Sequence, residues 1–346
     1  MNSLDVVVVP DFQGEKSRIF EARTLLFLAS WLEYGGKACD FPLHLACIGE
    51  PPDSVRRLAQ VCDARISVHK PVTDQLPRFA NKLRGFEVEA QTESLLLVDL
   101  DVLVLGDFSS LANYKDCISA APENVARVLE DYWQRIYAGL NVALPLERIP
   151  TVRWELGMSR NRIPFSNGED SAMLPYFNSG IIIAPWSCDL RQKWQENIIS
   201  IAALFDNERN EQKRGWKAVC ACDQAGFAVA IEQLKQEGVS FRRLPHDCHS
   251  NTNHLYRRTV SLEQTKLFHA LRMFRNPAHF VDEMKTDLKF FHHQYRKLLI
   301  KGDWARDRTQ PKIVTMRNCL WPALKDNRRF YKRLKYLNEK YVEKYR

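Results

Sequence analysis

The 346-residue chain lacks any apolar run long enough to cross a bilayer. Its first residues, MNSLDVVVVPDF, carry no basic segment and only a four-valine apolar stretch, so we expect no secretory signal. Its nine cysteines are odd in number and lack the spacing of a disulfide framework. Together these absences predict a cytoplasmic protein with reduced thiols.

Basic charge is abundant, but it is concentrated at one end. Residues 296–346 hold 16 Lys and Arg against 5 Asp and Glu, a net of +11. The whole chain carries +8, so the remaining residues carry −3. We therefore expect a near-neutral catalytic domain over residues 1–295 and a basic, aromatic C-terminal tail over 296–346.

The tail allows two interpretations. A basic amphipathic helix could rest on an anionic membrane, which would make the protein peripheral to the inner face of a membrane. Alternatively, the helix packs on the body with its charges in solvent. No nucleic acid is expected as a partner, because no recognised nucleic-acid motif is present.

Short apolar strands alternate with helical segments, which predicts an α/β fold with a mostly parallel central sheet. The strands are expected at Val6–Val9, Leu43–Ile48, Ala64–His69, Ser94–Leu105, Cys117–Ala121, Asn178–Pro185, Val239–Leu244 and Lys266–Met273. The helices are expected at Ser17–Tyr34, Ser54–Gln60, Pro77–Val88, Val125–Val142, Leu190–Leu204, Asp223–Leu234 and Val281–Ile300. The polar stretch within 122–175 predicts an inserted lid over a site.

Two aspartates interrupt the most apolar strand, SLLLVDLDVLVLGD. Because side chains alternate along a strand, Asp99 and Asp101 are expected on the same face. Two neighbouring carboxylates repel, and a divalent cation such as Mn²⁺ or Mg²⁺ cancels that repulsion. An isolated Asp-x-Asp triplet is common and often only solvated, but ligands collect at the carboxyl ends of strands in α/β sheets.

The same Asp-x-Asp motif allows a second hypothesis, a haloacid-dehalogenase-like phosphatase with Asp99 as its nucleophile. Gly302-Asp303 with Asp307 resembles a later element of that family. Against it, three predicted strands precede Asp99, and Leu103 stands where that family usually has Thr. A third hypothesis is a non-catalytic module that binds membranes or polyanions.

Further polar residues open later elements. Asn178, Ser179 and Gly180 begin an apolar strand, where glycine allows close approach of a ligand and the two side chains can bond sugar hydroxyls. Asp223 and Gln224 begin a helix, although an acid there needs no function. His269 ends a late strand.

In this order, these motifs resemble the retaining glycosyltransferases of family 8, which have the GT-A fold. The resemblance covers roughly residues 6–275. It implies a metal-dependent hexosyltransferase that uses a UDP-sugar donor, a glycan or lipid-linked acceptor, and Mn²⁺ (or Mg²⁺). It also implies retention of configuration at the anomeric carbon.

The resemblance implies metal ligation by Asp99, Asp101 and His269, with Asp99 also binding the donor ribose. It assigns Lys82 to the donor sugar or phosphates, and Asn178, Ser179 and Gly180 to the donor sugar. It places Asp223 at a sugar hydroxyl and Gln224 near the anomeric carbon. Asp11 is a candidate for the nucleotide base.

One motif departs from the family pattern. His-x-x-Gly-x-x-Lys is replaced by His269, Arg272 and Arg275. Arg275 can clamp a phosphate in place of Lys, whereas Arg272 removes the close backbone approach that glycine allows. Residues 246–254 are rich in His and Cys, but their spacing matches no standard zinc site, and a polar loop near the site is favoured.

Overall fold

The computed structural model describes residues 3–72, 78–123, 128, 130–151, 171–206, 223–250, 262–269, 329–330 and 332–345. A seven-stranded sheet with the order β10-β6-β9-β4-β1-β2-β3 forms its centre. Its strands are β1 (Asp5–Val8), β2 (Leu43–Ile48), β3 (Arg65–His69), β4 (Ser94–Val98), β6 (Ile118–Pro122), β9 (Phe177–Pro185) and β10 (Phe241–Arg243). All neighbouring pairs are parallel except those of β9, which runs antiparallel to β4 and β6.

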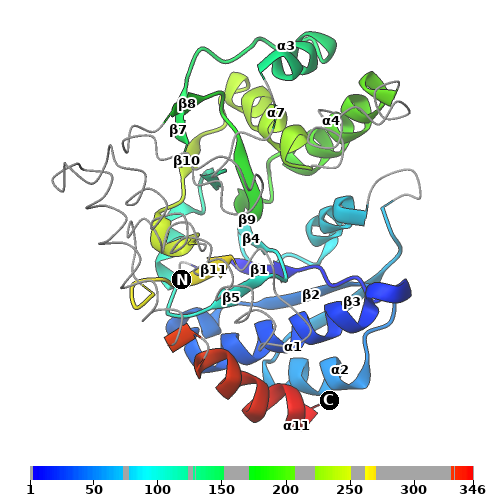
Figure 1. Ribbon diagram of the computed structural model, residues 1–346, viewed down its shortest axis with the longest axis vertical. Helices are drawn as coiled ribbons and strands as arrows, with labels where there is room; N and C mark the ends of the chain where they lie inside the picture. The colour runs from blue at the N-terminus through cyan, green and yellow to red at the C-terminus, as the bar shows by residue number, and fades with distance from the viewer. Residues whose placement is uncertain are drawn as a thin grey trace, which may run out of the picture.

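Helices cover both faces of this sheet (Figure 1). One face carries α1 (Ser17–Tyr34) and α2 (Asp53–Val61); the other carries α3 (Glu130–Gly139), α4 (Leu190–Leu204) and α7 (Asp223–Gln236). The valines of β1 show why two cores form: Val6 and Val8 enter the α1 side, whereas Val7 enters the α7 side. This is the α/β architecture predicted for a GT-A fold.

Two small antiparallel sheets complete the described fold. One joins β5 (Val102–Val104) to β11 (Leu267–His269), and the other joins β7 (Ile149–Thr151) to β8 (Ser171–Met173). Residues 152–170 of the predicted lid and the helix predicted at Val281–Ile300 lie outside the described residues.

The single strand predicted over Ser94–Leu105 is wrong. The chain leaves the central sheet after Val98, turns through residues 99–101, and enters the separate β5–β11 sheet at Val102. The apolar residues before and after the two aspartates cannot reveal this break, because the strands on both sides of the turn are buried. The helix predicted at Pro77–Val88 is a 3-10 segment, Arg78–Glu87, rather than an α-helix.

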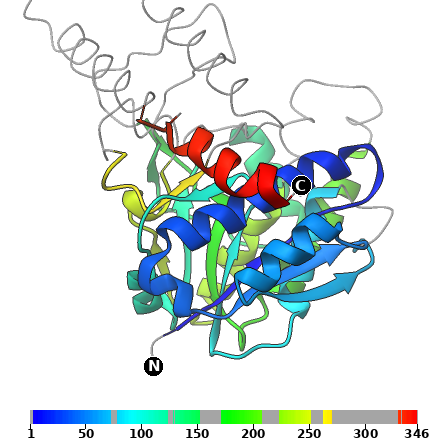
Figure 2. The ribbon, with the colours of Figure 1, turned by 90° about the horizontal axis from the view of Figure 1, so that it is seen from below.

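The C-terminal helix, residues 329–345 apart from the undescribed residue 331, packs along α1 and α2 (Figure 2). It includes the segments Asn338–Val342 and α11 (Glu343–Tyr345). Its buried apolar side chains are Phe330, Leu334, Leu337 and Val342. Three polar groups of this helix, the hydroxyls of Tyr336 and Tyr341 and the Lys340 ammonium, donate to Glu33 of α1. The described part of the tail is therefore part of the folded body.

The amino-terminal end of β1 is anchored by a buried carboxylate. Asp5 accepts hydrogen bonds from the backbone of Gln91 and Thr92, the indole of Trp186 and the ring of His44, at 2.9–3.2 Å. Burial alone raises the pKa of Asp5, but these hydrogen bonds together outweigh burial and lower it. The carboxylate thus joins β1 and β2 to the segment just before β4 and to the residue just after β9.

Replacing Asp5 with asparagine should lower the free energy of unfolding by about 1.5–3 kcal/mol, the usual loss for hydrogen bonds to a charged group. Because its pKa is lowered in the folded protein, Asp5 contributes stability above its ordinary pKa of 3.8. That contribution disappears as the pH falls through the lowered value. Urea unfolding should therefore show a difference between wild type and Asp5→Asn that shrinks below about pH 4.

The exposed Asp40 provides a matched control, and Asp40→Asn should change stability by less than about 0.5 kcal/mol. Equal stability of wild type and Asp5→Asn at pH 7 would contradict the anchoring role.

Candidate active site

The turn between β4 and β5 carries both aspartates of the Asp-x-Asp motif. The Asp99 amide donates to the Gly180 carbonyl of β9 at 2.8 Å, and the Val102 amide donates back to the Asp99 carbonyl at 3.0 Å. The first bond continues the β4–β9 ladder, and the second closes the turn. The turn thus holds Asp99 and Asp101 at the carboxyl end of β4, where parallel sheets collect ligands.

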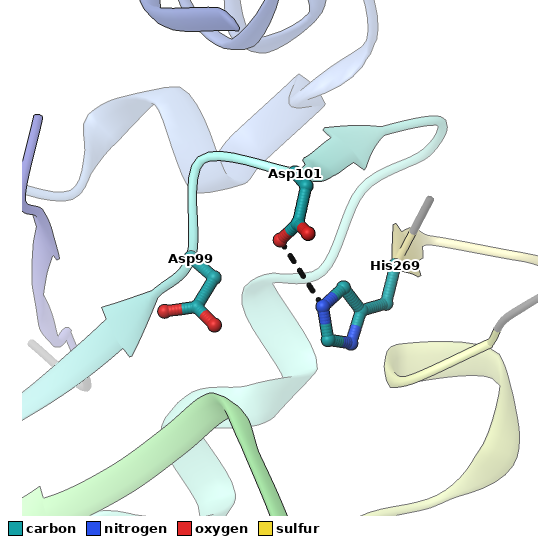
Figure 3. Close-up of side chains that lie close together, drawn as sticks. All are labelled: Asp99, Asp101 and His269. Carbon is teal, nitrogen blue, oxygen red and sulfur yellow. Dashed lines mark hydrogen bonds and ion pairs between the residues drawn. The ribbon is translucent and has the colours of Figure 1, made fainter. Parts of the chain in front are cut away.

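Pairing of β5 with β11 brings His269 to the same place. His269 is the register partner of Val102, which directly follows Asp101. The His269 Nε2 lies 3.1 Å from Asp101 Oδ1, and one ligand atom from each of Asp99, Asp101 and His269 lies within 4.8 Å of the others (Figure 3). Two carboxylates and one imidazole form a donor set that fits Mn²⁺ or Mg²⁺.

Burial and mutual contact set the charges of this trio. Burial alone raises the pKa of Asp101, but the ring of His269 outweighs it and lowers the pKa. Burial alone lowers the pKa of His269, but Asp101 outweighs it and raises the pKa. Burial raises the pKa of Asp99, and the neighbouring Asp101 adds to the rise. Crowded negative charge of this kind is what a bound cation relieves.

Lys82 forms the centre of a second group of contacts. Its ammonium lies 3.0 Å from Asp99 and 2.9 Å from Asp223, and it donates to the Ser179 hydroxyl at 3.1 Å. Ser179 in turn donates to Asp223 at 2.8 Å. Burial alone lowers the pKa of Lys82, but the two carboxylates outweigh it and raise the pKa. Lys82 therefore stays charged and links the Asp-x-Asp turn to the start of α7.

A third group of contacts depends on Glu123, which the sequence analysis did not identify. Its buried carboxylate accepts from the amides of Asn178 and Gln224, at 2.8 and 2.9 Å. The Tyr176 hydroxyl donates to the Gln224 oxygen at 2.8 Å. Glu123 follows β6 directly, and its burial is not encoded in any local motif, so only the folded arrangement reveals it.

Gly180 allows the His269 ring to approach the backbone of β9. A Cβ added at Gly180 would lie 2.4 Å from His269 Cε1 and 2.9 Å from Nδ1. The Gly180 amide is also held by the Asn178 oxygen at 2.8 Å. Any side chain at this position must therefore displace the imidazole from the trio.

Gly180→Ala should weaken Mn²⁺ binding by about 10²-fold, the scale of loss for a displacement of about 1 Å at a functional site. Electron paramagnetic resonance of free Mn²⁺ in a titration measures this directly. In Gly106→Ala, the added Cβ would meet nothing closer than 3.6 Å, so that variant should bind Mn²⁺ like wild type. Unchanged affinity in Gly180→Ala would contradict the geometry described for His269.

Asp11 and Arg275 are the two remaining predicted site residues. Asp11 follows β1, is buried, and accepts from Asn81 at 3.2 Å, next to Lys82 in sequence. Arg275 lies outside the described residues, as do Gly302 and Asp303. Of loop 246–254, the first five residues are described, and His249 contacts His269 at 3.1 Å.

A family model described as a Rhodobacterales glycosyltransferase domain matches residues 20–235. Among curated proteins, none matches. Among solved structures, the chain is similar to the galactosyltransferase LgtC in complex with donor and acceptor sugar analogues, at 13% identity and TM-score 0.48, covering 88% of this chain and 99% of that one. It is also similar to mouse xyloside xylosyltransferase 1, at 12% identity and TM-score 0.44, covering 78% of this chain and 97% of that one.

Proposed function

Because the chain belongs to the Rhodobacterales glycosyltransferase family, we propose that it moves a hexose from a UDP-sugar to a glycan or lipid-linked acceptor, with a divalent cation and with retention of configuration. The phosphatase and the non-catalytic module are set aside, because the family match makes this chain a glycosyltransferase. The observation that carries the proposal is the grouping of Asp99, Asp101 and His269 beside residues 178–180 and the start of α7.

In this proposal, Asp99, Asp101 and His269 hold Mn²⁺ or Mg²⁺. The bound cation supplies positive charge for the diphosphate leaving group. Lys82 adds a charge already fixed by Asp99 and Asp223, so no reorganisation is needed when phosphate charge develops. Arg275 is proposed as a further phosphate clamp on sequence grounds alone.

In this proposal, the residues in contact with Glu123 form the part of the site that binds the donor sugar. Both side-chain amides, of Asn178 and Gln224, point their NH₂ groups at the Glu123 carboxylate, so the orientation of each amide is set before a donor binds. Carboxylates of Glu123 and Asp223 near the anomeric carbon would stabilise the positive charge that develops there. Asp223 and Ser179 would also bond sugar hydroxyls, and Asp11 would contact the nucleotide base.

Binding calorimetry with a panel of nucleotide sugars tests this function. A UDP-hexose should bind in the presence of Mn²⁺ and lose most of its affinity in a chelator. Binding that is equal with and without metal would contradict the metal-dependent proposal, and failure of every UDP-sugar would contradict the donor class.

An anionic membrane surface remains a prediction for the C-terminal tail. The apolar side chains of the described C-terminal helix pack against the body, so they are not available to insert into a membrane. Lys332, Lys335 and Lys344 are exposed on that helix, so contact with lipid would have to be electrostatic and sensitive to salt. Among the described residues, none of the helices is long and apolar enough to span a membrane.

A further inference from the structure

The ring of His269 is held on its far side by a second histidine. His249 Nε2 lies 3.1 Å from His269 Nδ1, and the two rings are tilted by 27° with centroids 5.3 Å apart. Both side chains are buried, at 1% and 4% exposure. The other nitrogen of His269, Nε2, is the one that faces Asp101.

Backbone contacts fix the segment that carries His249. Ser250 bridges to Phe268 of β11: its amide donates to the Leu267 carbonyl at 3.0 Å, and its carbonyl accepts from the His269 amide. Just upstream, the Asp247 carbonyl accepts from the Lys266 amide at 2.7 Å. The segment 247–250 therefore runs alongside β11, and His249 is positioned by the same strand that positions His269.

A neutral imidazole carries one proton, so its two nitrogens have opposite roles. A cation bound through Nε2 requires the proton of His269 to be on Nδ1. That proton then needs an acceptor, and His249 Nε2 is at hydrogen-bonding distance. The His269 ring cannot shift toward β9 either, because Gly180 of that strand lies directly against the Cε1 atom of His269.

We propose that His249 is a positioning residue: it accepts the Nδ1 proton of His269 and so holds that ring in the tautomer and orientation that bind a divalent cation through Nε2. This inference rests on the metal site of the proposed function. It goes beyond the metal ligands themselves, because His249 would not touch the cation. Partners of this kind to ligating histidines commonly change metal affinity by about 10–100-fold when removed.

Three substitutions of His249 test the proposal through Mn²⁺ affinity, measured by electron paramagnetic resonance without any donor. His249→Phe keeps a ring but removes the acceptor, and should weaken binding by about 10–100-fold. His249→Gln places an amide oxygen near the position of Nε2 and should remain within about threefold of wild type. His249→Asn is too short to reach Nδ1 and should resemble His249→Phe.

The outcomes separate this inference from the function on which it rests. Failure of wild type to bind Mn²⁺ would contradict the metal site itself. Wild-type binding with unchanged affinity in His249→Phe would overturn only the role of His249. Equal weakening in His249→Gln and His249→Asn would also overturn it, because packing rather than an acceptor would then matter. Comparison of these last two variants decides the matter even if His249→Phe fails to fold.

Discussion

Replacing Asp101 with asparagine should lower kcat/KM for sugar transfer by about 10²–10³-fold, comparable to the loss of one preorganised charge-stabilising group. Asparagine keeps the size of the side chain but removes the negative charge that would bind the cation. Asp101 supplies that charge at neutral pH, because the ring of His269 lowers the pKa of Asp101 despite its burial. The rate should be measured with the donor that the calorimetric panel identifies.

Asp116→Asn is the matched control for Asp101→Asn. Asp116 is exposed and precedes β6, at the end of that strand opposite to Glu123, so its loss should leave transfer unchanged. A higher Mn²⁺ concentration should restore part of the activity of Asp101→Asn, whereas Asp116→Asn should keep the Mn²⁺ dependence of wild type. Full activity of Asp101→Asn at limiting Mn²⁺ would contradict ligation by Asp101.

Lys82→Met is expected to have the largest effect on stability, about 3–5 kcal/mol, the usual cost of removing one partner from a buried ion pair. The methionine fills a similar volume but leaves Asp99 and Asp223 without their shared ammonium. The exposed side-chain fraction is 28% for Asp99 and 10% for Asp223, so the loss should fall toward the lower end of that range. Urea unfolding in a chelator measures it.

Bound metal should offset part of the stability that Lys82→Met loses. With the ammonium gone, the carboxylates repel more strongly, so Mn²⁺ should raise the melting temperature of Lys82→Met more than that of wild type. Lys335→Met is a useful comparison, because Lys335 pairs with a carboxylate, Glu339, and both of these side chains are exposed at the surface. That variant should lose at most about 1 kcal/mol. Equal stability losses in the two lysine variants would contradict a special role for burial at Lys82.

Adding Asp223→Asn to Lys82→Met should recover part of the lost stability, because one of the two uncompensated carboxylates is then neutral. A double variant that is less stable than Lys82→Met would show that Asp223 is held by other contacts, such as the Ser179 hydroxyl, more than by the ammonium.

The sequence predicted the central sheet well where a strand is buried along its whole length. Val6–Val9, Leu43–Ile48 and Asn178–Pro185 all correspond to strands, because residues covered on both faces leave a continuous apolar run. The same signal failed at Ser94–Leu105, where one run spans two sheets and the turn between them. An apolar run shows that residues are buried and cannot show in which sheet they are buried.

The chain's own residues determined an α/β fold, a pair of aspartates after its most apolar strand, and the small polar triplet 178–180 that opens another strand. These features are local, so they are written in neighbouring positions of the sequence. Only the tertiary structure decided that His269 pairs beside Asp101 from 168 residues away, that Lys82 is shared by two carboxylates, and that Glu123 and His249 belong to the site. Contacts between distant residues depend on how strands pair and helices pack, and no short pattern encodes that.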